Sequence, residues 1–489
     1  MKLKTPFLTG FSAKLCGSAK RALQASIRAK REKLLRNCLG SFARQFSDLV
    51  PPELLESLSK TQRNRIFSNP VTFWAWLSQI LEQNDSCNAA VSRVQAWCLE
   101  NGLPVPSSET TTYCKARIRL SQEFITAVHQ HVVREMERAV RSEDLYRGLM
   151  VKSVDGSSVQ LMDTGANQLR YPQPSGQKEG CGFPVMKFVG VLNHAHGGWE
   201  THLSAPLSEK DFVTMRRLIS HFGPETLLLA DRGFCRYEII ARLLAKGCHS
   251  LMRLHQMREK AFTLRKGKRL GKNERLVTWI KPARKPKTTE LSDAEWEQLP
   301  ATLEMRLISF WYETREGEIK KMVLATTLLD YQKYDWIELG ELYATRWDIE
   351  LRLRDVKTTL GMEELNVKTP AMAQKSLAMA LLGFNFVKAT CRRSVRNAPG
   401  SWKLISFKGT LDAIKSLQSL FTAVVTKSKK KFAELMDKML ALVSTKRLEV
   451  RPARWEPRMK KKRPKPYPSL DRPRQKYKEM RESGELVPA

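Results

Sequence analysis

LMVKSVDGSSVQL, residues 149–161, and LLLADRGF, residues 227–234, are the two stretches of sequence that decide the fold class. The first alternates apolar and polar residues as a half-buried strand does, and the second opens with an apolar run typical of a buried strand. Asp155 lies in or just after the first strand, and Asp231 lies at the end of the second. Carboxylates at such positions are costly unless they bind a cation or are otherwise paired.

The segments around these strands extend the same pattern. Strands are predicted at residues 183–193 (FPVMKFVGVLN), 199–207 (WETHLSAPL) and 249–254, and helices at 212–222 and 237–245. The order βββαβαβ predicts an α/β fold with a mixed sheet that can carry helices on both faces. Residues 146–255 are therefore the first part of one domain, and residues 331–370 complete it.

Residues 256–330 interrupt this domain. After a stretch rich in Lys, Arg and Gly, three alternating segments predict strands, and we interpret the region as a β-rich insertion. The segments are LVTWIKP, EMRLISFWYE and KKMVLATTLL. Beyond the insertion, Asp335 is expected to cap a long helix, with Glu338 as its capping-box partner and Gly361 as its C-terminal stop.

The charge balance points to a polyanionic partner. The 489-residue chain has 84 Lys and Arg against 50 Asp and Glu, a formal charge of +34, which exceeds what solubility alone requires. The longest apolar stretch, near residues 377–387, is far shorter than the roughly 20 residues that span a bilayer. We interpret this stretch as a buried core helix, so nucleic acid is favoured over a membrane as the partner.

The basic N-terminus lacks an apolar segment of signal-peptide length, so we expect a cytoplasmic protein.

Residues 1–145 show helical periodicity and no strand-like alternation, so we interpret them as a helical, DNA-binding N-terminal domain. Near residues 89–99 one helix precedes a Gly102-Leu-Pro turn, and a second begins after Ser107. This arrangement resembles a loose helix-turn-helix. The second helix carries the candidate DNA contacts Lys115, Arg117 and Arg119. Helical hairpins with basic faces are also common in proteins that do not bind DNA.

The C-terminal part divides into residues 371–450, a helical region interrupted near Asn397, and residues 451–489, a basic Pro-rich tail. The tail has little to bury, so it is expected to be disordered before it meets DNA, or else to be merely solvated.

Cysteine and histidine spacing identifies no clear metal site. The nine cysteines are scattered without a Cys-x-x-Cys pair, as expected of reduced structural thiols. His194 and His196, with His202 nearby, could ligate a metal, but the adjacent Gly197-Gly198 favours a turn between two strands.

The long helix after Asp335 carries a polar stripe. At about 100° per residue, Arg346, Glu350 and Lys357 fall on the same side as Tyr343, with an apolar stripe beside them. An acid flanked by Arg, Lys and Tyr is compatible with gripping phosphates beside a carboxylate-held metal. A solvated helix face with ion pairs is the alternative.

Together, Asp155, Asp231 and Glu350 form a set of three hard oxygen ligands. Such a set suits Mg²⁺ or Mn²⁺, and a two-ion arrangement can cut and join phosphodiesters without a nucleophilic side chain. The chain has no phosphate-binding loop of the Gly-x-x-x-x-Gly-Lys-Ser/Thr type, no Gly-x-Ser-x-Gly elbow and no His-Glu-x-x-His helix, so ATP-driven and hydrolase chemistries are unsupported.

The residue spacing on the long helix and the two Asp segments together carry a specific family resemblance. The spacing Tyr343-x2-Arg346-x3-Glu350-x6-Lys357 resembles the YREK signature of bacterial transposases of the insertion-sequence-4 type, and SVDGS and LLLADRGF resemble the strands that bear the two Asp of that family's DDE triad. The resemblance covers most of the chain. It implies a ribonuclease-H-like catalytic domain that is interrupted by the β-rich insertion.

The resemblance also implies function. Divalent-metal cleavage at transposon ends would be followed by attack of the 3′-OH on target DNA, in an assembly in which a homodimer pairs two ends. Asp155, Asp231 and Glu350 would bind the metal ions, and Tyr343, Arg346 and Lys357 would contact phosphates of the terminal nucleotides.

Two further roles follow less directly. Arg232, beside Asp231, is a candidate phosphate contact or a surface residue. Related enzymes pass through a hairpin at the transposon end and stack a flipped base on a Trp of the insertion. The candidates for this Trp are Trp279, Trp296, Trp311 and Trp336. Their spacing does not identify the one that would stack a base, and ordinary packing also explains each of them.

Two other classes of function share parts of this pattern. A DNA-binding repressor would explain the charge and the helical domain, but it has no use for carboxylates that face phosphates. A structure-specific nuclease would use the same triad without a joining step. The terminal inverted repeats, the target preference and the oligomeric state before DNA binding do not follow from the sequence.

Overall fold

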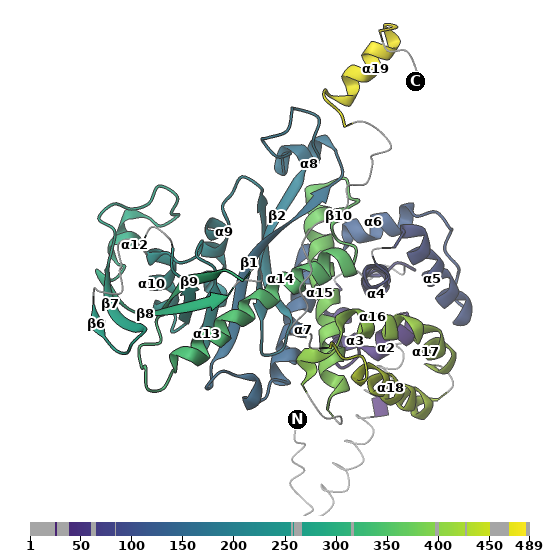
Figure 1. The fold of residues 1–489 in the computed structure, drawn as a ribbon. Helices are drawn as coiled ribbons and strands as arrows, with labels where there is room; N and C mark the ends of the chain where they lie inside the picture. Colours follow the sequence, from purple (N-terminus) through teal and green to yellow (C-terminus); the bar gives the residue numbers. More distant parts are fainter. Residues whose placement is uncertain are drawn as a thin grey trace, which may run out of the picture. The chain divides into compact units, whose positions relative to one another are not determined.

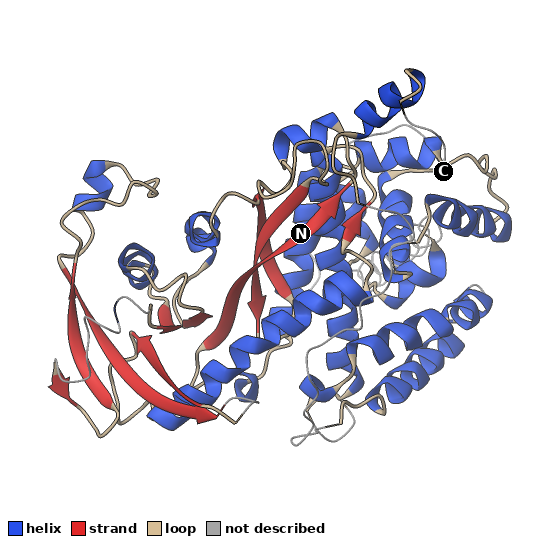
Figure 2. Cartoon of the chain, turned by 45° about the horizontal axis from the view of Figure 1, so that its top comes forward, coloured by secondary structure: helices blue, strands red, loops and turns tan. Residues whose placement is uncertain are grey.

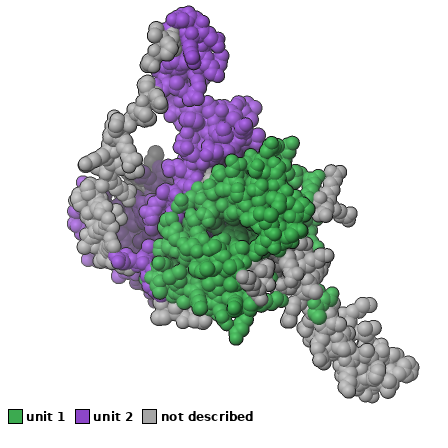
Figure 3. All heavy atoms as spheres, turned by 90° about the vertical axis from the view of Figure 1, so that its right-hand side faces the viewer, with its two compact units in different colours: residues 1–135, 390–446 green, residues 136–389, 447–489 purple. Residues whose placement is uncertain are grey.

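The computed structural model describes residues 25–26, 39–59, 65–83, 85–255, 258, 267–313, 317–396, 401–425, 428–449 and 469–485. The chain forms two compact units, shown in different colours in Figure 3. Unit 1 comprises residues 1–135 and 390–446, and unit 2 comprises residues 136–389 and 447–489.

Unit 1 is helical, as predicted for the N-terminal part. Its helices are α2 (Gly40–Gln45), α3 (Pro52–Ser57), α4 (Asn69–Leu81), α5 (Cys87–Glu100), α6 (Thr111–Arg119), most of α7 (Gln122–Arg138), α16 (Phe407–Ser416), α17 (Gln418–Val425) and α18 (Lys429–Ser444). Ser68 caps α4 by accepting from the N–H of Val71, and a Pro follows in the first turn, where no N–H is needed.

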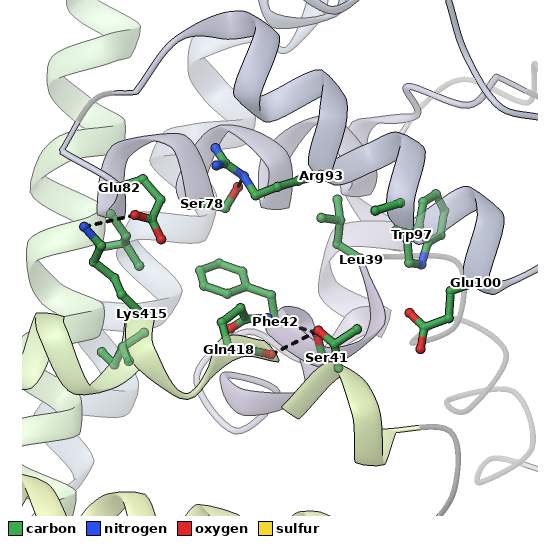
Figure 4. Close-up of a pocket in the computed structure, with 14 residues that line it drawn as sticks. Leu39, Ser41, Phe42, Ser78, Glu82, Arg93, Trp97, Glu100, Lys415 and Gln418 are labelled. Atoms are coloured by element: carbon green, nitrogen blue, oxygen red, sulfur yellow. Dashed lines mark hydrogen bonds and ion pairs between the residues drawn. The ribbon is translucent and has the colours of Figure 1, made fainter. Parts of the chain in front are cut away.

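Helices from the two ends of the sequence pack together within unit 1. Gln45 of α2 donates to Gln418 of α17 at 2.8 Å, and Ser41 lies 3.0 Å from Thr422. Figure 4 shows a pocket of about 410 Å³ between these segments, with Lys415 paired to Glu82 at 2.9 Å. The N-terminal and C-terminal helical regions, which sequence alone separates, therefore share one core.

Unit 2 is built on a ten-stranded sheet in the order β3-β2-β1-β4-β5-β9-β8-β7-β6, with β10 paired to β1 (Figures 1 and 2). Its strands are β1 (Met150–Leu161), β2 (Val185–Asn193), β3 (Trp199–Pro206), β4 (Thr226–Ala230), β5 (His249–Arg253), β6 (Lys268–Arg269), β7 (Glu274–Ile280), β8 (Thr302–Glu313), β9 (Ile319–Thr326) and β10 (Glu364–Leu365). Pairs β1–β4 and β4–β5 are parallel, and β1–β2 and β2–β3 are antiparallel. The predicted mixed sheet is confirmed, and the predicted βββαβαβ order differs from the structure by the short helix α8 (Gly165–Arg170), which lies between β1 and β2.

Helices cover both faces of this sheet. Alternate residues of β4 point to opposite faces, so Leu228 joins a core with α9 (Asp211–Leu218) and α10 (Tyr237–Ala245), while Leu229 joins a core with α13 (Trp336–Ala344). The other helices of unit 2 are α8 (Gly165–Arg170), α12 (Asp293–Glu297), α14 (Asp348–Arg354), α15 (Pro370–Ser394, which continues into unit 1) and α19 (Arg474–Glu482).

The insertion contains the three predicted strands, and these extend the central sheet. β9 pairs antiparallel with β5, in the register Leu251↔Thr326, and β8 and β7 follow outward. An exposed edge strand leaves unpaired N–H and C=O groups, and β9 satisfies those of β5. The insertion is therefore continuous with the domain that it interrupts.

The long helix predicted after Asp335 is interrupted. Between α13 and α14 lies a 3₁₀ turn, Thr345–Trp347, and after α14 lies a π-helical segment, Asp355–Thr359. Asp335 caps α13 by accepting from the N–H groups of Ile337 and Glu338. The chain leaves the helix at Gly361, whose φ of 68° favours glycine, as predicted.

The capping box predicted at Glu338 is wrong. Its carboxylate instead pairs with the guanidinium of Arg147 at 2.8 Å and accepts from the Tyr146 hydroxyl. The Glu338 side chain, which the local sequence pattern assigned to the helix cap, therefore forms a tertiary ion pair instead.

Three expectations concern the remaining chain. Residues 377–387 lie in α15 and contain the predicted buried apolar run, and no helix among the described residues is long and apolar enough to cross a membrane. The seven cysteines in the described ranges are free thiols. In the tail, residues 450–468 and 486–489 lie outside the described residues, whereas residues 474–482 form α19, contrary to the expectation of disorder.

Candidate active site

Asp155 lies in the middle of β1, just past the residues that pair with β4, and Asp231 directly follows the last residue of the parallel strand β4. The β1–β4 register pairs Ser153 with Leu229, so two further residues along each strand bring Asp155 beside Asp231. Both line one pocket of about 440 Å³, together with the loop of residues 207–212. The register of these two parallel strands therefore brings the two acids together where β4 ends.

The environment of Asp155 disfavours its charged form. Its side chain is 22% exposed, and its Oδ1 accepts from the N–H of Gly156 at 2.8 Å. Burial raises the pKa of Asp155 to about 6, although the Gly156 N–H and the Arg346 guanidinium both lower it. The neighbouring carboxylates of Asp231 and Glu350 raise it further.

Glu350 extends from α14 towards the same place and is half exposed at 46%. Between it and Asp155 lies Arg346, whose Nη1 is 3.6 Å from Asp155 Oδ2 and whose Nη2 is 3.5 Å from Glu350 Oε1. The helix-borne acid and the strand-borne acid are thus joined through one guanidinium. Sequence spacing predicted that Arg346 and Glu350 share one helix face. The fold also brings Asp155 of β1 close to Arg346.

Tyr343 attaches the helix to the sheet. It is 3% exposed, and its hydroxyl donates to the carbonyl of Ala230, the residue before Asp231, at 3.2 Å. Burial raises the pKa of Tyr343 to about 12. In this structure the hydroxyl that was expected to reach a phosphate is engaged by the strand that carries Asp231.

The other predicted contacts differ in exposure. Lys357 is half-buried in the π-helical segment, and Arg232 is exposed in the turn after Asp231. On α6, Lys115 and Arg119 are exposed. Arg117 is 9% exposed, because its guanidinium stacks on Trp76 at 4.5 Å and donates to Cys87. Because Arg117 packs on Trp76, it is not part of the exposed basic face that was predicted on this helix.

Lys187 and Asp211 were not singled out from the sequence. Lys187 of β2 is 8% exposed and lies 2.8 Å from Asp211, and both line the pocket beside Asp155. A Cβ at Gly156 would lie 2.6 Å from the Asp211 carboxylate, so a larger residue there would require this carboxylate to shift. The one signal available in the sequence was a Lys within the apolar strand FPVMKFVGVLN.

Among the described residues, a single group of three metal-ligating side chains has its ligand atoms within 4.8 Å of one another: Glu137, His196 and Glu200. His196 Nδ1 accepts from the N–H of Gly198, so a neutral ring carries its proton on Nε2 and offers no lone pair there. Lys152 Nζ already lies 2.7 Å from Glu200. This cluster is therefore a poor metal site.

His194 and His202 do not join that cluster. The Nε2 of His194 lies 2.6 Å from the Ser153 hydroxyl. His202 lies on β3 and is half-buried. The predicted turn is present, with Gly197 at a φ of 74°.

The four Trp candidates also separate by exposure. Trp279 and Trp296 are buried at 0% and 3%, and Trp336 is half-buried. Trp311 on β8 is 67% exposed.

Comparisons with known proteins bear on this arrangement. The family model described as "Transposase DDE domain" matches residues 147–386, a range that contains Asp155, Asp231 and Glu350. The transposase InsG for insertion sequence element IS4 of Escherichia coli strain K12 is 25% identical over 450 residues, which are 89% of this chain and 95% of that protein. A cryo-EM structure of the piggyBac transposase synaptic complex with hairpin DNA aligns with a TM-score of 0.40 and 9% identity, over 84% of this chain and 85% of that one.

Proposed function

Because the chain belongs to the DDE transposase family, we propose that it cleaves DNA at transposon ends with divalent metal ions and transfers the freed 3′-OH into target DNA. The observation that carries the proposal is the convergence of Asp155, Asp231 and Glu350 beside the end of β4, within the matched domain. The domain that holds them is proposed to be ribonuclease-H-like.

The three acids suit a hard divalent cation. They offer oxygen ligands only, and burial makes a lone charge on Asp155 costly, which a cation would offset. We propose that Asp155, Asp231 and Glu350 hold Mg²⁺ or Mn²⁺, with two ions in the complete site. Such ions activate the attacking oxygen and stabilise the leaving 3′ oxygen at phosphorus.

The side chains around the acids would hold the DNA. Arg346, Lys357 and Arg232 are the proposed phosphate contacts, since a guanidinium matches phosphate geometry and an ammonium supplies a compact charge. Tyr343 is proposed to act mainly by holding the helix against Ala230.

DNA further from the cut is proposed to meet α6. Lys115 and Arg119 present exposed charges there, whereas Arg117 is proposed to support the helix through Trp76. The partners are double-stranded DNA, namely the terminal inverted repeats and the target, and a second copy of the chain that pairs two ends.

The test is metal-dependent cleavage of a labelled duplex that carries the element's own end. Wild type is compared with Asp155→Asn and Glu350→Gln, and with Asp348→Asn as a matched control on the same helix. We expect site-specific cuts with Mg²⁺ or Mn²⁺ that both triad variants lose while they still bind the duplex. Cleavage that persists in either triad variant would remove that residue from the site.

Strand-transfer products distinguish this function from that of a nuclease. Adding supercoiled target DNA to pre-cleaved ends should give joined products with wild type. Cutting without any joining would leave a nuclease as the better description.

A further inference from the structure

Arg346 lies near two carboxylates but forms a short hydrogen bond with neither of them. Its nitrogens lie 3.6 Å from Asp155 and 3.5 Å from Glu350, whereas charge-assisted bonds of this kind are usually about 2.7–2.9 Å long. The side chain is 7% exposed, and its buried Nε has no hydrogen-bond partner within the part of the chain that the structure describes. A purely structural ion pair would satisfy more of these donors, so the guanidinium is held loosely.

The surroundings of Arg346 leave it a route outward. It lies in the 3₁₀ turn Thr345–Trp347, and its guanidinium stacks on the Trp347 ring at 4.5 Å. Trp347 is 56% exposed. Rotation of the Arg346 side chain along this ring would carry the guanidinium towards solvent without a change in the backbone.

The guanidinium and a divalent ion would compete for the same oxygens. Asp155 and Glu350 are two of the three proposed metal ligands, and the guanidinium group of arginine is a cation. A dication at these oxygens would be repelled by a guanidinium at the distances observed. Metal binding therefore requires the guanidinium of Arg346 to leave these oxygens, and a DNA phosphate would bind it in the bidentate geometry that arginine favours.

We propose that Arg346 is an exchangeable counter-ion that occupies Asp155 and Glu350 in the DNA-free protein and releases them when a DNA phosphate takes its guanidinium. The proposal rests on the function proposed above, since it needs the acids to be metal ligands. By linkage, DNA and the divalent ion then strengthen each other's binding by the same factor. The free protein would bind divalent ions weakly and so would not nick DNA before an end is seated.

The experiment measures the Mn²⁺ affinity of the full chain from the electron paramagnetic resonance signal of free Mn²⁺. Titrations are run with and without a short duplex that carries the element's end, and Mn²⁺ bound by the duplex alone is subtracted. In wild type the duplex should tighten Mn²⁺ binding about tenfold, within the usual range for coupled sites.

Arg346→Gln should bind Mn²⁺ about tenfold more tightly than wild type without DNA, and the duplex should add little. The matched control is Arg352→Gln, because Arg352 lies on α14, which follows the turn that holds Arg346, and pairs with Asp355 at 3.4 Å. This control should behave as wild type.

The other possible results of these titrations test the metal site and the exchange of Arg346 separately. If Arg346→Gln binds Mn²⁺ no more tightly than wild type, while Asp155→Asn abolishes binding, the metal site stands and the exchange is wrong. If Asp155→Asn and Glu350→Gln both bind Mn²⁺ as wild type does, the metal site fails and the exchange fails with it. Should Arg346→Gln not fold by circular dichroism, the wild-type titrations decide, and an affinity that the duplex leaves unchanged overturns the exchange.

Discussion

At the scale of single residues, Asp155 shows how the fold sets the chemistry of one group. Its strand neighbours bury it, and burial raises its pKa to about 6 from the model-peptide value of about 4. The carboxyl is therefore protonated below about pH 6 and ionised above it. A cation can use Asp155 fully only above that pH, so Mn²⁺ binding and cleavage should both fall as the pH decreases through 6.

A raised carboxyl pKa also affects stability, with a defined sign. Between about pH 4 and 6 the Asp155 carboxyl binds more protons in the folded state than in the unfolded chain, so its contribution to stability falls as the pH rises through this window. In metal-free protein at pH 7, Asp155→Asn should therefore increase the free energy of unfolding, by on the order of 2 kcal/mol.

Urea unfolding at pH 7 and pH 4 measures this effect. The gain should be present at pH 7 and much smaller at pH 4, where the folded carboxyl is protonated and so are roughly half of the unfolded carboxyls. A variant that is equally stabilised at both pH values would show that burial of the charge is not the cause.

Tyr343 was predicted as a phosphate contact, and the structure gives it a role in stability. Tyr343→Phe removes the hydroxyl that donates to Ala230 and leaves that buried carbonyl without this donor. The free energy of unfolding should fall by about 1 kcal/mol. Tyr331→Phe is the control, since Tyr331 is 44% exposed. Equal unfolding midpoints for Tyr343→Phe and wild type would argue that the hydrogen bond contributes nothing.

At the scale of secondary-structure elements, the paired strands β8 and β9 extend the sheet from its β5 edge and present Trp311 to solvent. Trp311 is 67% exposed and lies 5.9 Å from the ammonium of Lys321 on β9. The other insertion tryptophans are buried and serve packing. Among the four, Trp311 is therefore the one we propose as a stacking platform for an unpaired base.

Trp311→Ala should weaken binding of a duplex end with an unpaired terminal base by about 1–3 kcal/mol, the range usual for base–aromatic stacking. Binding of a fully paired duplex should change little, and thermal unfolding should be unaffected because the ring is exposed. Fluorescence anisotropy with the two duplexes makes the comparison. An equal loss for both duplexes would point to a general contact instead of stacking.

At the scale of the whole molecule, the charge of +34 is the feature that acts over distance. Neutralising DNA phosphates releases condensed counterions, so the logarithm of the affinity should fall linearly with the logarithm of the salt concentration. If six to ten phosphates are contacted, roughly, affinity should fall by about 10³- to 10⁵-fold between about 50 and 200 mM salt.

Anisotropy titrations at several salt concentrations measure this slope. Lys115→Ala and Arg119→Ala should each make it shallower by about one unit if the exposed face of α6 meets phosphates. Arg117→Ala should instead lower the unfolding temperature, because Arg117 packs on Trp76. A slope that neither exposed residue changes would remove α6 from the DNA interface.

The sequence alone determined the features that depend on local order. Period-two alternation and short apolar runs predicted the strands around Asp155 and Asp231, and the cap at Asp335 and the stop at Gly361 bounded the helical segment that carries Glu350. These predictions succeeded because backbone geometry makes each of them a property of a few neighbouring residues.

Only the tertiary structure decided which side chains meet. Strand register brought Asp155 beside Asp231, and the 3₁₀ turn placed Arg346 between Asp155 and Glu350. Packing buried Arg117, and the edge of β5 recruited the insertion strands into one sheet. Such contacts join residues far apart in the chain, so their energies depend on burial and on the partner strand, and no local pattern encodes them.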